Sequence, residues 1–159
     1  MCIRDREIIL GDLENPQVLD LLKRHLDGMH ESSPPEHVHA LGITALKKPE
    51  ISFWILQKAG IVMGCGALKS IDNQIGEIKS MRTHSDHLRQ GVAARILDHI
   101  ISQARQRHYS RLSLETGTTP EFDAALNLYS KYGFEIGEPF GDYTDNAFSQ
   151  FMHLNLGAA

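Results

Sequence analysis

The chain is poor in cysteine, because Cys2 and Cys65 are the only two among its 159 residues. Two cysteines do not build the disulfide framework of a small secreted protein, so a reducing, cytoplasmic setting is expected. Long apolar runs are also missing. No stretch approaches the length of a membrane span, and the first residues lack the apolar segment of a signal peptide. We therefore expect no membrane partner.

A strong excess of charge of either sign is absent as well. Lys and Arg number 16, Asp and Glu number 20, and the formal net charge at pH 7 is −4. This balance gives no reason to expect nucleic acid as a partner. The hydrophobic fraction of 42% and the length suit one globular domain. We expect that domain to span residues 7–157, because residues 1–6 fit the following pattern poorly and are interpreted as an extraneous start.

The first half of the chain predicts a strand, a helix and three antiparallel strands. Asn15-Pro16 begins the helix, and Gly28 is expected to end it. Lys58-Ala59-Gly60 is typical of a hairpin turn between two apolar runs. The predicted strands cover residues 7–10, 51–57, 61–68 and 76–83.

The second half predicts a long helix, a parallel strand, a shorter helix and two final strands. Apolar residues recur with helical spacing over residues 91–108. Residues 111–115 form the next strand, and the order strand–helix–strand makes it parallel to the strand before the helix. The remaining elements are a helix over residues 122–132, ended by Gly133, and strands over residues 134–136 and 150–156.

The turn that leads into the long helix is the most informative segment. It reads Ser85-Asp86-His87-Leu88-Arg89-Gln90-Gly91-Val92-Ala93. A glycine allows backbone amides to approach a ligand closely, and a helix start directs its positive dipole end at the same ligand. This arrangement favours a phosphate-bearing ligand. Asp86 and His87 are expected to cap the helix.

The histidines are not expected to bind a metal. His37-x-His39 and His84-x-x-His87 have the spacing of ligand pairs, but no second cysteine or carboxylate cluster completes a tetrahedral set. Cys65 lies between two glycines in a strand and is interpreted as a small core residue.

Three segments, together with the order of the elements, resemble the GNAT superfamily of N-acetyltransferases. They are Glu77–Thr83, Leu88–Ala93 and Leu128–Phe134, the last of which contains Leu-Tyr-x-x-x-Gly-Phe. The resemblance covers most of the chain from Glu7 onward. It implies a mixed α/β (α+β) fold, in which helices flank a mostly antiparallel central sheet and a splayed pair of strands binds acetyl-CoA.

The resemblance assigns acetyl-CoA, as a co-substrate, to the glycine turn and the strand before it. The family's turn is usually Gln/Arg-x-x-Gly-x-Gly/Ala. Leu88 stands at the first position, where the family has Gln or Arg, and this departure affects only the contact that such a side chain would make. Arg89 is either a helper at the phosphates or a solvated surface residue. The backbone of Met81 and Thr83 would hold the pantetheine arm. The amides implied at the pyrophosphate are those of Leu88, Arg89, Gln90, Gly91, Val92 and Ala93.

The same resemblance implies a catalytic acid and a catalytic base. Tyr129 occupies the family's position for the general acid that protonates the departing thiolate, and the alternative is a core tyrosine. Glu77 matches a strand glutamate that some members use as the base, and burial raises the pKa of a carboxyl toward a useful range. An exposed strand carboxylate is the alternative for Glu77. Glu115 and His39 are further candidates for the base.

The acceptor is expected to be a small amine or an amino-acid-like molecule. The candidate acceptor-binding residues are His39, Trp54, Phe140 and Tyr143, although the aromatic ones are also compatible with simple packing. The predicted function is acetyl transfer to a primary amine by direct transfer in a ternary complex, with a homodimer as the candidate assembly. The alternative is a non-catalytic acyl-CoA-binding regulatory module. A nucleotide-binding protein is disfavoured, because neither phosphate-loop fingerprint is present.

Overall fold

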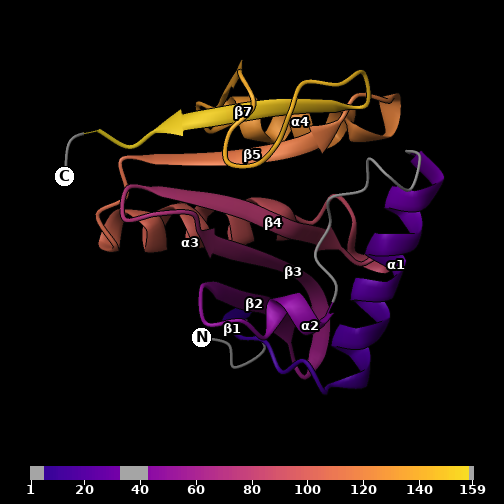
Figure 1. The fold of residues 1–159 in the computed structure, drawn as a ribbon. Helices are drawn as coiled ribbons and strands as arrows, with labels where there is room; N and C mark the ends of the chain where they lie inside the picture. The colour runs from indigo at the N-terminus through magenta and orange to yellow at the C-terminus, as the bar shows by residue number, and fades with distance from the viewer. Residues whose placement is uncertain (1–5, 33–42, 158–159) are drawn as a thin grey trace.

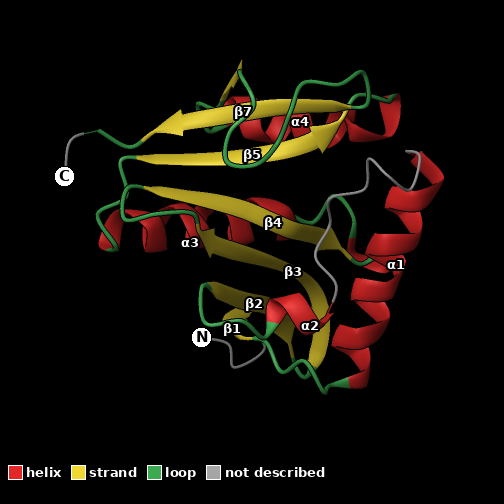
Figure 2. Cartoon of the chain, viewed as in Figure 1, coloured by secondary structure: helices red, strands yellow, loops and turns green. Residues whose placement is uncertain are grey.

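The fold is a single seven-stranded sheet with helices on both faces, in a computed structural model that describes residues 6–32 and 43–157 (Figures 1 and 2). The strand order is β1-β2-β3-β4-β5-β7-β6, in which only the β4–β5 pair is parallel. This confirms the mixed, mostly antiparallel sheet. The strands are β1 (Glu7–Leu10), β2 (Ile51–Lys58), β3 (Ile61–Ser70), β4 (Ile75–Thr83), β5 (Arg111–Gly117), β6 (Glu135–Gly137) and β7 (Ser149–Asn155).

The helices divide the core into two layers. In Figure 1, α1 and α2 lie on the near face of the sheet, while α3 and α4 lie behind it. The larger apolar cluster is formed under α3 and α4, and the smaller one joins α1 and α2 to β2 and β3. Among the described residues, no helix combines the length and apolarity needed to cross a membrane. The helices are α1 (Pro16–Ser32), α2 (Ile43–Leu46), α3 (Val92–Gln106) and α4 (Asp123–Lys131).

The predicted hairpin is confirmed. Ala59 and Gly60 form a two-residue connection between β2 and β3, with φ values of 52° and 78°. Two consecutive left-handed residues are the signature of a type I′ turn, whose twist matches that of the flanking strands. The parallel pairing of β4 with β5 and the C-terminal glycine of α4, Gly133 at φ 96°, also agree with the sequence.

The expected end of α1 at Gly28 is wrong, because the helix continues to Ser32. A glycine inside a helix costs only about 1 kcal/mol relative to alanine, so it does not stop a helix that other contacts hold. Val18, Leu21 and Leu22 are buried in the smaller cluster and anchor the first turns of α1 against the sheet.

The expectation that Asp86 and His87 cap the long helix is also wrong. Both belong to a separate 3-10 turn, η2 (Ser85–His87), in which the His84 ring accepts a hydrogen bond from the Asp86 amide. The N-cap of α3 is Gly91, at φ 78°, and no side chain bonds there. Within residues 6–32 and 43–157, no side chain therefore accepts a hydrogen bond from the first amides of α3.

Candidate active site

The sheet splits between β4 and β5. The two strands are paired from Ile75–Arg111 to Ile78–Leu114 and not beyond, although β4 continues to Thr83. β5 stays paired with β7 as far as Gly117. On its β5 side, the backbone of residues 79–83 therefore has no strand partner within the described residues. This confirms the predicted splayed pair.

A bulge in β4 lies at the start of this split. The β3–β4 register shifts between Cys65 and Ala67, and Ser80 takes a left-handed conformation with φ 56°. The Cys65 thiol donates a hydrogen bond to the Ser80 carbonyl at 3.2 Å. The bulge changes which side chains face each side of the sheet, because an extra residue reverses the alternation of a strand. Met81 consequently packs in the α3 layer with Ile78.

The glycine turn lies directly before α3, as the sequence predicts. Arg89 and Gly91 are both left-handed, at φ 62° and 78°, and Gln90 between them is exposed. Leu88 is 57% exposed, so its side chain is available at the turn rather than packed in the core. Arg89 is exposed, Val92 is buried under the sheet and Ala93 is partly buried. Arg6 donates a hydrogen bond to the Gln90 carbonyl.

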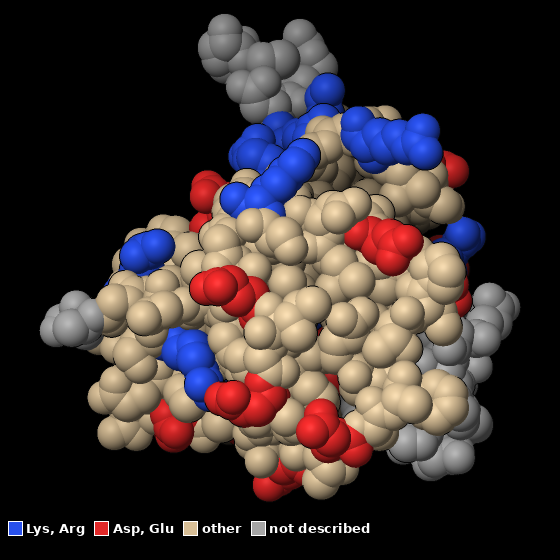
Figure 3. Space-filling view, turned by 90° about the horizontal axis from the view of Figure 1, so that it is seen from above, with Lys and Arg blue, Asp and Glu red and all other residues tan. Residues whose placement is uncertain are grey.

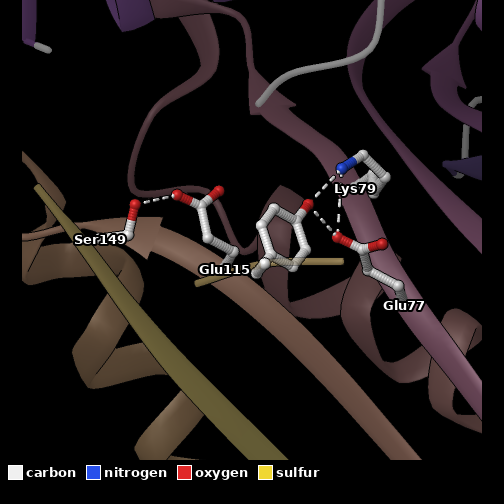
Figure 4. A network of polar contacts seen from close by, with 5 residues as sticks. Glu77, Lys79, Glu115 and Ser149 are labelled. Atoms are coloured by element: carbon white, nitrogen blue, oxygen red, sulfur yellow. Dashed lines mark hydrogen bonds and ion pairs between the residues drawn. The ribbon is translucent and has the colours of Figure 1, made fainter. Parts of the chain in front are cut away.

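Glu77 is the centre of a buried polar network on the face of β4 opposite α3 (Figure 4). Its Oε2 accepts a hydrogen bond from the Tyr143 hydroxyl at 2.6 Å and pairs with the Lys79 Nζ at 3.1 Å. The side chains of Glu77 and Lys79 are only 3% and 7% exposed. Lys79 also donates to the Tyr143 hydroxyl at 2.7 Å, which closes a triangle of three groups.

Burial raises the pKa of Tyr143 far above its ordinary value, and the neighbouring carboxylates of Glu77 and Glu115 add to that effect. The Tyr143 hydroxyl is therefore protonated throughout the physiological range and acts as a permanent donor to Glu77. Glu115 accepts a hydrogen bond from Ser149 at 2.7 Å (Figure 4). The charges of two carboxylates, Glu77 and Glu115, thus act on one tyrosine hydroxyl.

The segment that carries Tyr143, residues 138–148, is fastened to the sheet at several points. Phe140 is buried, and its ring packs edge-on against the rings of Tyr143, Phe151 and His153. The His153 Nε2–H donates to the Glu138 carbonyl at 2.8 Å. Phe140 and Tyr143, both predicted near the acceptor, are therefore in contact with each other, and Tyr143 alone of the two bonds to Glu77.

Tyr129 lies near the end of α4 and is 6% exposed. Its ring meets the Phe134 ring at a centroid distance of 5.5 Å. Burial raises its pKa well above the ordinary tyrosine value. Among the described residues, no hydrogen bond reaches its hydroxyl.

Trp54 does not lie with Glu77 and Tyr143, although it was predicted to contact the acceptor. It is 5% exposed in the α3 layer, where its ring meets His99 edge-on at 5.0 Å and the Arg107 guanidinium at 5.8 Å. Burial lowers the pKa of His99, so that ring is neutral at pH 7. His39 falls outside the described residues.

Lys79 is the member of the network that the sequence reading missed. It stands two residues after Glu77 on the same strand, and side chains at that spacing share a face. An acidic and a basic residue at this spacing, on a strand expected to be buried, were the available signal. Tyr143 is linked to Glu77 across 66 positions of sequence, which no local pattern indicates.

The described residues offer no evident metal site, and charges of both signs lie on the face drawn in Figure 3. They contain no group of three or more His, Cys, Asp or Glu side chains that would hold a metal ion. Figure 3 shows basic side chains gathered mainly along one edge of the face it presents, and acidic ones spread over the rest.

The sheet order, the split between two parallel strands and the glycine turn at a helix start together define the acyltransferase class of α/β fold. The chain belongs to the acetyltransferase (GNAT) family, whose pattern matches residues 15–134. It is an N-acetyltransferase by family.

The relatives agree with this membership. The chain is 50% identical over 149 residues to the uncharacterized N-acetyltransferase YsnE of Bacillus subtilis, covering 94% of this chain and 99% of that one. It is 36% identical over 142 residues to an IAA acetyltransferase of Azospirillum brasilense, covering 88% and 89%. A GNAT acetyltransferase of Elizabethkingia anophelis, solved with acetyl-CoA bound, shares the fold at a TM-score of 0.67 and 19% identity, covering 95% and 98%.

Proposed function

We propose that this protein transfers the acetyl group of acetyl-CoA to a primary amine, by direct transfer in a ternary complex. The observation that carries the proposal is the early end of β4–β5 pairing at Ile78–Leu114. An unpaired strand edge offers backbone donors and acceptors to an extended, amide-containing molecule. The pantetheine arm of acetyl-CoA has that chemistry.

The residues present fit acetyl-CoA. The backbone of Met81 and Thr83 lies on the unpaired edge and would bind the pantetheine arm. The amides of residues 88–93 would bind the pyrophosphate, because the left-handed turn at Gly91 and the uncapped start of α3 leave donors and a positive dipole end there. Acetyl-CoA supplies the acetyl group as a thioester, and CoA is released as the free thiol.

Two side chains of this chain carry the proton transfers. Glu77 takes a proton from the ammonium form of the acceptor, so that the nitrogen keeps its electron pair for attack on the thioester carbonyl. Tyr129, whose pKa is raised by burial, stays protonated at neutral pH and donates to the departing sulfur. An amide near Met81 polarises the carbonyl, and fixed donors of this kind are often the largest single catalytic contribution.

The acceptor pocket is proposed to lie beside Glu77, with Phe140 and Tyr143 as its wall. His39 remains a candidate contact. Aromatic rings next to two carboxylates suit a small molecule that combines an apolar body with an amine. The Azospirillum relative is named an IAA acetyltransferase, and from that name we infer for this protein only that the acceptor is a small molecule.

A reducing, cytoplasmic setting is proposed as well, and the buried free thiol of Cys65 is compatible with it.

The test is acceptor-dependent release of free CoA thiol, measured with acetyl-CoA and a panel of primary amines that includes 2-phenylethylamine. We expect Tyr129→Phe to lower kcat about 10²-fold or more, because general acid–base groups contribute on that scale. Tyr109→Phe is the matched control, since this tyrosine is also buried in the larger core cluster but lies outside the proposed site.

The competing outcome is tight CoA binding with no acceptor-dependent thiol release by the wild type. That result would replace the enzyme with an acyl-CoA-binding regulatory module. Equal activity of wild type and Tyr129→Phe would instead remove only the role of Tyr129.

A further inference from the structure

The two oxygens of the Glu77 carboxylate are not equivalent. Oε2 accepts both hydrogen bonds, one from Tyr143 and one from Lys79 (Figure 4). Among the described residues, no hydrogen bond reaches Oε1. A carboxylate oxygen that already accepts hydrogen bonds from two strong donors is a poorer proton acceptor than an oxygen that accepts none.

The donors on Oε2 form a continuous chain. Lys79 donates to the Tyr143 hydroxyl at 2.7 Å, and that hydroxyl donates onward to Glu77 at 2.6 Å. Hydrogen bonds in such chains polarise and strengthen one another, most of all in a buried site. The Lys79 ammonium also lies 5.5 Å from the centre of the Tyr143 ring, so the cation holds the ring as well as the hydroxyl.

The Tyr143 side chain, which links Lys79 to Glu77 in this series of hydrogen bonds, is itself held in place. Phe140 packs on Tyr143 at a centroid distance of 5.1 Å, and Phe151 packs on it at 5.6 Å. The hydroxyl is thus presented to Glu77 by a ring that is wedged between neighbours. A carboxylate held by two such donors cannot rotate freely about its own bond to swap its oxygens.

We propose that Lys79 and Tyr143 are positioning residues that hold Oε2 of Glu77 and leave Oε1 as the atom that takes the proton from the acceptor amine. The inference rests on the proposed function, because it presumes that Glu77 is the base. The proton leaves the ammonium nitrogen of the acceptor and is bound at Oε1, and the nitrogen keeps the electron pair. Neither Lys79 nor Tyr143 gains or loses a proton in this step.

The proposal predicts a defect that depends on the charge of the acceptor. Two isosteric probes provide the comparison: 2-phenylethylamine, which is protonated at pH 7, and O-benzylhydroxylamine, whose nitrogen is neutral at pH 7. If the wild type turns over neither, the best amine of the panel and its aminooxy isostere take their place. The amine must lose a proton before its nitrogen can attack, so a mispositioned base slows it. The aminooxy nitrogen attacks as the free base, and its proton is lost only after attack, from an adduct acidic enough to release it to water.

We expect Tyr143→Phe, which keeps the ring, to lower kcat/KM for the amine at least tenfold. The same variant should leave kcat/KM for the aminooxy probe and KM for acetyl-CoA within about twofold. Lys79→Met should show the same selectivity, and Lys79→Arg should restore much of the loss because it keeps the cation. Lys58→Met, at the exposed end of β2, is the matched control for removing a lysine.

Glu77→Gln separates this proposal from the proposed function. If Glu77→Gln slows both probes equally or neither, the base assignment itself fails. If Glu77→Gln slows the amine selectively while Tyr143→Phe affects both probes alike or neither, the base stands and the positioning proposal is overturned. Should Lys79→Met fail to fold, Tyr143→Phe and Lys79→Arg still decide the question.

Discussion

Lys79→Met is expected to lower the free energy of unfolding at pH 7 by about 3–5 kcal/mol. The Lys79–Glu77 pair has an N–O distance of 3.1 Å, and both side chains are more than nine-tenths buried. With an effective dielectric constant of 20, two unit charges at that separation attract each other by about 5 kcal/mol. Removing the cation leaves the Glu77 carboxylate buried with the Tyr143 hydroxyl as its remaining donor on Oε2.

The assay is urea unfolding followed by tryptophan fluorescence. Trp54 is the only tryptophan of the chain and is 5% exposed in the larger core cluster, so its emission reports on global unfolding. Arg24→Met is the control, because the Arg24–Asp20 pair on α1 has an N–O distance of 2.9 Å with side chains 51% and 53% exposed. Breaking that solvated pair should cost no more than about 0.5 kcal/mol.

A double-mutant cycle then isolates the pair. Glu77→Gln combined with Lys79→Met removes both charges, and we expect the double variant to be more stable than the sum of the two single losses by about 2 kcal/mol or more. The reasoning is refuted if Lys79→Met costs less than about 1 kcal/mol, or if the two single losses simply add.

Two further predictions concern Cys65 and Gly91. Burial raises the pKa of the Cys65 thiol from 9.0 to about 12, so its contribution to stability is complete below pH 9 and is lost as the pH rises from 9 toward 12. The stability of the wild type relative to Cys65→Ala should fall by about 1.4 kcal/mol between pH 8 and pH 10 in urea unfolding, and a constant difference would contradict this. Gly91 and Gly60 both have a φ of 78°, and a Cβ added at either position would meet no atom of the described residues, its chain neighbours aside, closer than 3.8 Å. Gly91→Ala and Gly60→Ala should therefore each cost about 1 kcal/mol of stability, because of the backbone conformation alone. Only Gly91→Ala should raise KM for acetyl-CoA, and equal KM values would remove the turn from the cofactor site.

The order of the strands and of the three longer helices was predictable because each of them carries a local signal. Helical spacing indicated α3, Ala59-Gly60 indicated the hairpin, and the strand–helix–strand order fixed the parallel β4–β5 pair. The errors arose where a local signal competes with tertiary contacts. Gly28 is a weak helix breaker inside an α1 whose first turns are packed on the sheet. Asp86 is part of η2, which ends before α3 begins at Val92, so it lies too far from the first turn of α3 to cap it.

The site was predictable only in part, because its members are joined by long-range contacts. Glu77 was predicted from its match to a strand glutamate of the family, but its hydrogen-bond partner Tyr143 comes from an irregular segment, and no periodicity predicts where that side chain lies. The sequence also did not predict on which face of the sheet the Trp54 side chain lies. Four consecutive residues of β2 are buried, so alternation of polar and apolar residues gives no parity there.

The bulge at Ser80 explains how one strand serves two proposed tasks. Glu77 and Lys79 precede the bulge and face the Tyr143 wall, whereas Met81 follows it and faces α3. In an unbroken strand, Glu77, Lys79 and Met81 would all share one face. The left-handed Ser80, whose carbonyl is held by the Cys65 thiol, turns the rest of β4 and coincides with the end of its pairing with β5. The proposed base therefore stands on the paired half of β4 and the proposed cofactor edge on the unpaired half, only a few residues apart. A thioester and an amine that approach from different directions can meet at such a junction.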